Sequence, residues 1–148
     1  MDKNSLQMEN ERIRVIIVDD HKMVRETWRM LLDGYQQVFV IKECNSGTEA
    51  INEAPALDPH VILMDINMTP VNGFEATRKI LKSSPHIKII GMSVNNQPGY
   101  ARNMMQLGAR GYMTKNSSRE EMIRAIKEVM KGKTYICHEV WNKMSGNM

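Results

Sequence analysis

The sequence has little cysteine: Cys44 and Cys137 are its only two among 148 residues. They are far apart, and neither belongs to a C-x-x-C pair or a Cys/His cluster, which argues against a disulfide framework and a zinc site. No apolar run approaches the roughly 18 to 20 residues that span a bilayer. The first residues also lack the apolar core of a signal peptide. The sequence therefore predicts a cytoplasmic protein with two free thiols and no membrane segment.

The glycine-rich motifs that bind nucleotide phosphates are also missing. Neither G-x-x-x-x-G-K-[ST] nor G-x-G-x-x-G occurs, which disfavours nucleotide enzymes. The net charge is only +3, and basic residues are mixed with acidic ones, so no electrostatic footprint for nucleic acid stands out. With 42% hydrophobic and 25% charged residues, the composition fits one globular domain.

Short apolar runs alternate with amphipathic stretches along the chain. We expect strands at residues 13–18, 38–43, 61–64, 87–92 and 110–113. We expect helices between 23 and 34 and at 46–54, 74–81, 98–107 and 117–130. Five strands alternating with five helices predict an α/β fold with a parallel sheet covered on both faces. Residues 1–11 are expected to be disordered, and residues 133–148 to form a tail or the start of a linker.

Polar side chains follow four of the predicted strands. The first is followed by Asp19 and Asp20, the third by Asp65, the fourth by Ser93 and the fifth by Lys115. The carboxyl ends of parallel strands share one edge of a sheet, where ligands bind. Clustered carboxylates repel one another unless a cation neutralises them, and an open all-oxygen site suits Mg²⁺. The pattern predicts Mg²⁺-dependent phosphoryl transfer with Asp65 as nucleophile, helped by the serine hydroxyl and the lysine ammonium.

Each of these residues also has a commonplace reading. An aspartate after a strand often caps a helix or a turn, and a lone serine or lysine is often only a surface residue. A phosphatase of the haloacid dehalogenase type also uses an aspartyl nucleophile. That family needs a second aspartate two residues later, however, and here Asn67 stands at that position. The order and spacing of all four signals nevertheless favour a phosphoryl-transfer site over these commonplace readings.

Four motifs carry a family resemblance: VDDHKMVRETWRMLL, VILMDINMTPVNGFEATRKI, IIGMSV and GARGYMTKNS. With them, residues 12–132 resemble the receiver domain of two-component response regulators, most closely in the NarL/FixJ (LuxR-type) subfamily. The resemblance implies a flavodoxin-like, doubly wound five-stranded sheet with strand order 2-1-3-4-5. Two departures are Thr69 and Asn116, which stand where many relatives have proline.

The resemblance also implies roles for single residues. Asp65 would be the phosphoacceptor, Lys115 would bind the phosphoryl group, and Ser93 with Tyr112 would form a switch pair. Mg²⁺ would be ligated by Asp65 together with two further groups, the carboxylate of Asp20 and the backbone carbonyl of Asn67. Asp19 would act on the metal through water.

The function implied is a phosphorylation-dependent signalling switch rather than an enzyme with an external substrate. A sensor histidine kinase or phosphotransfer protein would phosphorylate the chain, whose own chemistry would be limited to Mg²⁺-dependent self-phosphorylation from a donor and autodephosphorylation. Phosphorylation would alter the face of helix 98–107, strand 110–113 and helix 117–130, and a homodimer could form. The output would be transcription through a DNA-binding domain absent from this sequence. The alternative is a stand-alone receiver that docks proteins or serves a phosphorelay. No DNA binding by this chain alone is expected, because the tail after Gly132 is too short for a helix-turn-helix.

Overall fold

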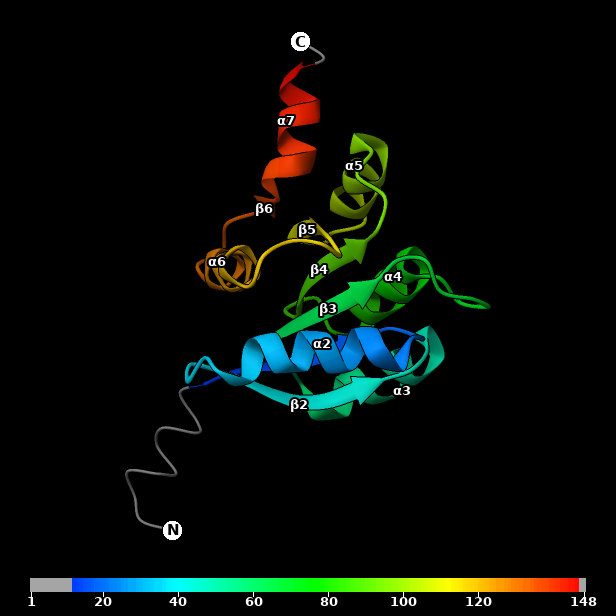
Figure 1. The fold of residues 1–148 in the computed structure, drawn as a ribbon. Helices are drawn as coiled ribbons and strands as arrows, with labels where there is room; N and C mark the ends of the chain where they lie inside the picture. Colours follow the sequence, from blue (N-terminus) through cyan, green and yellow to red (C-terminus); the bar gives the residue numbers. More distant parts are fainter. Residues whose placement is uncertain (1–11, 147–148) are drawn as a thin grey trace.

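The computed structural model describes residues 12–146. All the strands of this part of the chain belong to one parallel sheet (Figure 1). Its strands lie in the order β2-β1-β3-β4-β5-β6. They are β1 (Ile13–Val18), β2 (Val38–Cys44), β3 (Val61–Asp65), β4 (Lys88–Ser93), β5 (Gly111–Thr114) and β6 (Tyr135–Ile136). The parallel sheet and the predicted order of the first five strands are confirmed. The predicted disorder of residues 1–11 lies outside the described residues.

Six helices belong to the described residues: α2 (Lys22–Asp33), α3 (Gly47–Leu57), α4 (Gly73–Ser83), α5 (Pro98–Gln106), α6 (Arg119–Met130) and α7 (His138–Gly146). Helix α2 contacts α6, whereas α3, α4 and α5 contact one another in a row. This division is that of a doubly wound sheet with helices on both faces. Within the described part of the chain, no helix has the length and apolar character needed to cross a bilayer.

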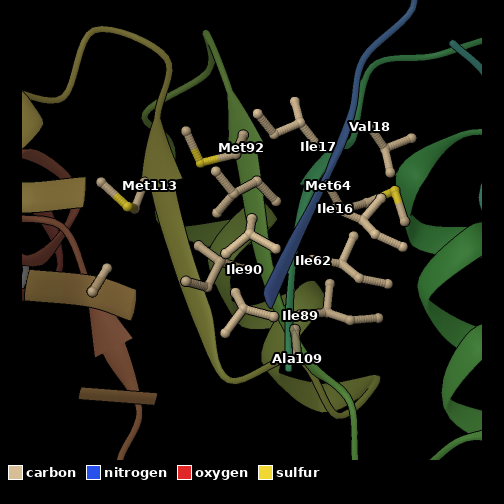
Figure 2. Close-up of a cluster of buried hydrophobic side chains, with 14 of the residues drawn as sticks. Ile16, Ile17, Val18, Ile62, Met64, Ile89, Ile90, Met92, Ala109 and Met113 are labelled. Atoms are coloured by element: carbon tan, nitrogen blue, oxygen red, sulfur yellow. The ribbon is translucent and has the colours of Figure 1, made fainter. Parts of the chain in front are cut away.

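The central strands are apolar because both of their faces are covered. All five residues of β3 are buried, as are the last four of β1. Figure 2 shows side chains of three neighbouring strands, such as Ile16, Ile62 and Ile90, packed into one cluster. This core fixes the strands, and their carboxyl ends therefore meet at a rigid edge.

Helix α3 is longer than predicted. Ser46 caps it by accepting a hydrogen bond from the backbone N–H of Glu49, but the helix does not stop before Pro55 and continues to Leu57. A proline removes one N–H and crowds the preceding turn. Here it stands in the last turn, and the N–H of Asp58 still closes the helix on the carbonyl of Ala54, at 2.8 Å.

The count of five strands and five helices was wrong, because residues 135–146 form a sixth strand and a sixth helix among the described residues. We call residues 133–146 the C-terminal segment. Its strand β6 pairs in parallel with β5, with the N–H of Tyr135 donating to the carbonyl of Arg110. Its helix α7 lies beside α5 (Figure 1) and contacts both α5 and β5. Val140 of this helix is completely buried. Strand β5 is therefore covered along part of its length.

Candidate functional site

Asp65 is the last residue of β3 and is fully buried. Its Oδ1 atom accepts a hydrogen bond from the backbone N–H of Asn67, at 3.0 Å. Its Oδ2 atom is buried and has no hydrogen-bond partner among the described residues. Burial raises the pKa of Asp65, although the bonds from Asn67 and Lys115 act in the opposite direction. A buried carboxylate oxygen without a partner is a feature that a ligand would resolve.

Lys115 follows β5 and reaches across the sheet edge to two carboxylates. Its Nζ atom lies 2.8 Å from Oδ2 of Asp19 and 3.0 Å from Oδ1 of Asp65. Burial alone would lower the pKa of Lys115, but the hydrogen bonds to Asp19 and Asp65 outweigh it and raise this pKa. One ammonium therefore stands between two buried carboxylates, and the nearby carboxylate of Asp20 adds further negative charge.

The two aspartates after β1 differ in their surroundings. Asp19 is fully buried, and both of its oxygens have partners, because Oδ2 meets Lys115 and Oδ1 accepts from the backbone N–H of His21 at 2.8 Å. The Asp20 side chain is about 31% exposed, and its Oδ1 lies 2.9 Å from Nδ1 of His21. Asp20 is thus freer than Asp19 to bind a ligand from solvent.

The carboxylates fit a hard cation. Asp19, Asp20, His21 and Asp65 each offer one ligand atom, and these atoms lie within 4.8 Å of one another. The unpartnered Oδ2 of Asp65 and the exposed carboxylate of Asp20 are oxygen ligands of the kind that Mg²⁺ prefers. The backbone carbonyl of Asn67 belongs to the loop directly after Asp65, and its role as a ligand stays a prediction.

The predicted switch residues lie on neighbouring strands. Ser93 ends β4, where its Oγ donates to Oδ1 of Asn67 at 2.6 Å and accepts from the N–H of Asn95 at 3.0 Å. Tyr112 of β5 is fully buried, and its hydroxyl donates to the carbonyl of Asn95 at 2.6 Å. Burial raises the pKa of Tyr112 to about 12. The two predicted switch residues are therefore linked by hydrogen bonds to the same backbone, that of Asn95.

Sequence reasoning missed His21, Arg25 and Asn95. His21 contacts both aspartates, and Arg25 donates from Nη1 to the carbonyl of Asp19, at 2.7 Å. His21 directly follows the aspartate pair in the VDDH motif, which is a usable signal. Asn95 acts through its own backbone N–H and carbonyl, and the Arg25 side chain bonds to a backbone carbonyl, so neither contact leaves such a mark in a sequence.

Comparison with known proteins identifies the fold and the family together. The model of the response regulator receiver domain family matches residues 15–127. The crystal structure of a LuxR-family two-component response regulator from Aurantimonas sp. SI85-9A1 superposes with a TM-score of 0.88 at 26% identity, covering 92% of this chain and 97% of that one. The isolated receiver domain of RcsB from Salmonella enterica serovar Typhimurium was determined with the phosphomimetic BeF₃⁻. It superposes with a TM-score of 0.80 at 28% identity, covering 88% of this chain and 97% of that one.

Curated relatives are longer than this chain. The response regulator GacA of Pseudomonas viridiflava is 38% identical over 90% of this chain and 62% of its own length. The response regulator UvrY of Escherichia coli K12 is 35% identical over 90% of this chain and 61% of its own length. The chain thus spans about three fifths of these relatives. On the family match and the fold, the chain belongs to the response regulator receiver domains of two-component systems.

Proposed function

We propose that this receiver is a switch operated by phosphorylation of Asp65. The observation that carries the proposal is the buried, unpartnered Oδ2 of Asp65 next to the ammonium of Lys115. An oxygen that no group of residues 12–146 occupies is available for bonding, and the neighbouring cation would stabilise a phosphoryl group bound there. Sensor histidine kinases or phosphotransfer proteins are the proposed donors.

In the proposed reaction, a carboxylate oxygen of Asp65 forms a bond to phosphorus while the bond between phosphorus and the donor breaks. The donor atom leaves with the electron pair of the broken bond. Lys115 is close enough to pair with the phosphoryl oxygens in place of the carboxylate. Mg²⁺, when bound, neutralises charge on the phosphoryl group. Asp65, Asp20 and the Asn67 carbonyl would hold it, with Asp19 acting through water.

The chain itself would catalyse no reaction on an external substrate. Its chemistry would be Mg²⁺-dependent self-phosphorylation from a donor and autodephosphorylation. Phosphorylation would then change the face of α5, β5 and α6, since Ser93 and Tyr112 connect the acidic site to this face through Asn95. A cytoplasmic location is part of the proposal, because both thiols are free and buried.

The proposed output is transcription. The longer relatives include proteins described as response regulators and, in Brevibacillus brevis, the transcriptional regulatory protein DegU, 33% identical over 58% of its length. A DNA-binding domain outside these 148 residues would carry this output, with dimerisation on phosphorylation. DNA binding by this chain alone is not proposed. A stand-alone receiver that acts by protein docking or in a phosphorelay is the alternative output for the same switch.

The direct test is intact-mass measurement after incubation with acetyl phosphate and Mg²⁺. We expect one added phosphoryl group on the wild type and none on Asp65→Asn, because the amide is not a nucleophile for this transfer. Asp33→Asn is the matched control, since Asp33 is an exposed aspartate at the end of α2 and should leave labelling unchanged. Equal labelling of wild type and Asp65→Asn would overturn the assignment.

A further inference from the structure

The C-terminal segment covers the face that the proposed switch would alter. Strand β6 extends the sheet beyond β5, and α7 lies against α5 and β5. Val140 of α7 is fully buried there, and Met144 packs against the same core. Figure 1 shows α7, in red, beside α5. Any rearrangement of α5 and β5 would therefore change their contacts with this segment.

A polar network fixes α7 to two points close to the acidic site. Oε2 of Glu139 lies 2.9 Å from the hydroxyl of Thr114, which shares its one proton with Oδ1 of Asn116 at 2.6 Å. Oε1 of Glu139 accepts from the side-chain amide of Asn96 at 2.9 Å. The ammonium of Lys143 donates to Oδ1 of the same Asn96, at 2.8 Å. The hydrogen bonds from Asn96 and Thr114 lower the pKa of Glu139, so its carboxylate is charged at neutral pH. Thr114 directly precedes Lys115.

Hydrogen bonds also link Asp65 to the loop that contains Asn96. The N–H of Asn67 donates to Asp65, and the side-chain oxygen of Asn67 accepts from the hydroxyl of Ser93. The Ser93 oxygen in turn accepts from the N–H of Asn95, the neighbour of Asn96. The links measure 2.6 to 3.0 Å. A continuous path of bonded groups therefore joins the phosphoacceptor to Glu139.

The direction of the coupling follows from the single proton of the Ser93 hydroxyl. This proton is already donated to Asn67. A phosphoryl group on Asp65 adds strong acceptors, and Ser93 can donate to them only by turning away from Asn67. Turning would also move the oxygen that holds the N–H of Asn95. The loop that holds Glu139 through Asn96 would then lose one of its anchors.

We propose that docking of the C-terminal segment and phosphorylation of Asp65 oppose each other, with Glu139 as the positioning residue that couples them through Asn96 and Thr114. The inference rests on the proposed function of Asp65. Coupling between two sites is reciprocal: phosphorylation weakens docking of the segment, and loss of docking favours the phosphorylated state by the same factor.

The first experiment is hydrogen exchange of the whole chain with Mg²⁺, before and after addition of beryllofluoride as phosphoryl mimic. The amides of Tyr135 and Cys137 report docking, because they bond to the carbonyls of Arg110 and Tyr112. We expect both to exchange at least about fivefold faster in the loaded protein, the lower end of typical coupling. Fluorine NMR of the same samples measures loading. Loaded protein with unchanged or slower exchange would overturn the coupling alone, whereas absence of loading would overturn the proposed function as well.

The second experiment measures the reciprocal effect in variants. Glu139→Ala should bind beryllofluoride about fivefold more tightly than the wild type, whereas a change that merely loosened the fold would not raise affinity. Asn142→Ala is the matched control, because Asn142 is an exposed residue of the same helix and should leave affinity unchanged. Asn96→Ala should mimic Glu139→Ala, and the double variant should show less than the sum of the two effects. Unchanged affinity in folded Glu139→Ala, or additive effects, would overturn the proposal.

Discussion

Asp65 combines a buried charge with an incomplete set of partners. Lys115 is shared between Asp65 and Asp19, so its single positive charge does not balance two carboxylates. Burial of a carboxylate disfavours its charged form, and the pKa of Asp65 is raised for this reason first. The site is therefore prepared for a ligand at some expense to the stability of the free protein.

The buried charge predicts that Asp65→Asn changes the stability of the fold in a pH-dependent way. Because the pKa of Asp65 is higher in the folded than in the unfolded chain, the folded chain favours the protonated form. At neutral pH the buried carboxylate destabilises the wild type, and the variant should therefore be the more stable of the two. The advantage should shrink as pH falls through the raised pKa toward the ordinary value of 3.8, since the wild-type carboxyl becomes neutral. Thermal unfolding in EDTA at several pH values measures it. An advantage that grows on acidification would contradict the argument, and Asp33→Asn serves as the exposed control.

The sequence predicted which side chains would meet at the site, but not their individual bonds. Asp65 ends one parallel strand, and Asp19 and Lys115 directly follow two others, so topology alone brings them to one edge. That Lys115 pairs with both carboxylates, and that the proton of Ser93 goes to Asn67, depends on rotamers and loop shape. Those follow from packing among residues far apart in the chain.

At the scale of elements, the start of α4 holds the end of β3 in place. Gly73 begins α4, and its N–H donates to the carbonyl of Ile66 at 3.2 Å. A Cβ atom at Gly73 would overlap the backbone oxygen of Asp65 and the Cα of Ile66. The helix can therefore approach the phosphoacceptor this closely only with glycine at this position.

Gly73→Ala should consequently lower the free energy of unfolding by about 1–3 kcal/mol, the usual range for overpacking. It should also slow phosphorylation by acetyl phosphate, because the clash displaces the backbone that carries Asp65. Gly99→Ala in the first turn of α5 is the matched control, since a Cβ there meets nothing within 4 Å, and it should be neutral or stabilising. Urea unfolding and labelling rates measure both effects. Equal stability and labelling of the two variants would refute the role given to Gly73.

The elements that sequence reasoning missed are those whose formation depends on tertiary contacts. Strands β1 and β3 are continuous apolar runs and could be predicted alone. Strand β6 has only two residues, and its pairing with β5 rather than its own pattern makes it a strand. Helix α7 is short, and it packs through Val140 and Met144, a spacing of four that a linker can also show.

On the scale of the whole molecule, the acidic site joins elements that are distant in sequence. Asp20 follows β1, Asp65 ends β3, and Lys115 follows β5. These residues lie close together only in the folded chain, so a ligand that needs them binds the native state and not the unfolded one. Such a ligand stabilises the entire fold, in proportion to the logarithm of its concentration above the dissociation constant.

Mg²⁺ should therefore raise the melting temperature of the receiver. At a concentration one hundred times the dissociation constant, the gain in free energy of unfolding is about 2.7 kcal/mol, or roughly 5–10 °C for a chain of this size. The rise should vanish in Asp20→Asn, because that change removes the most accessible carboxylate of the cluster, whereas exposed Asp33→Asn should respond like the wild type. Scanning calorimetry in MgCl₂ against KCl of equal ionic strength separates specific binding from screening. A rise of the same size in Asp20→Asn would show that the cation binds elsewhere, because the only carboxylate of the cluster that is open to solvent would then be dispensable.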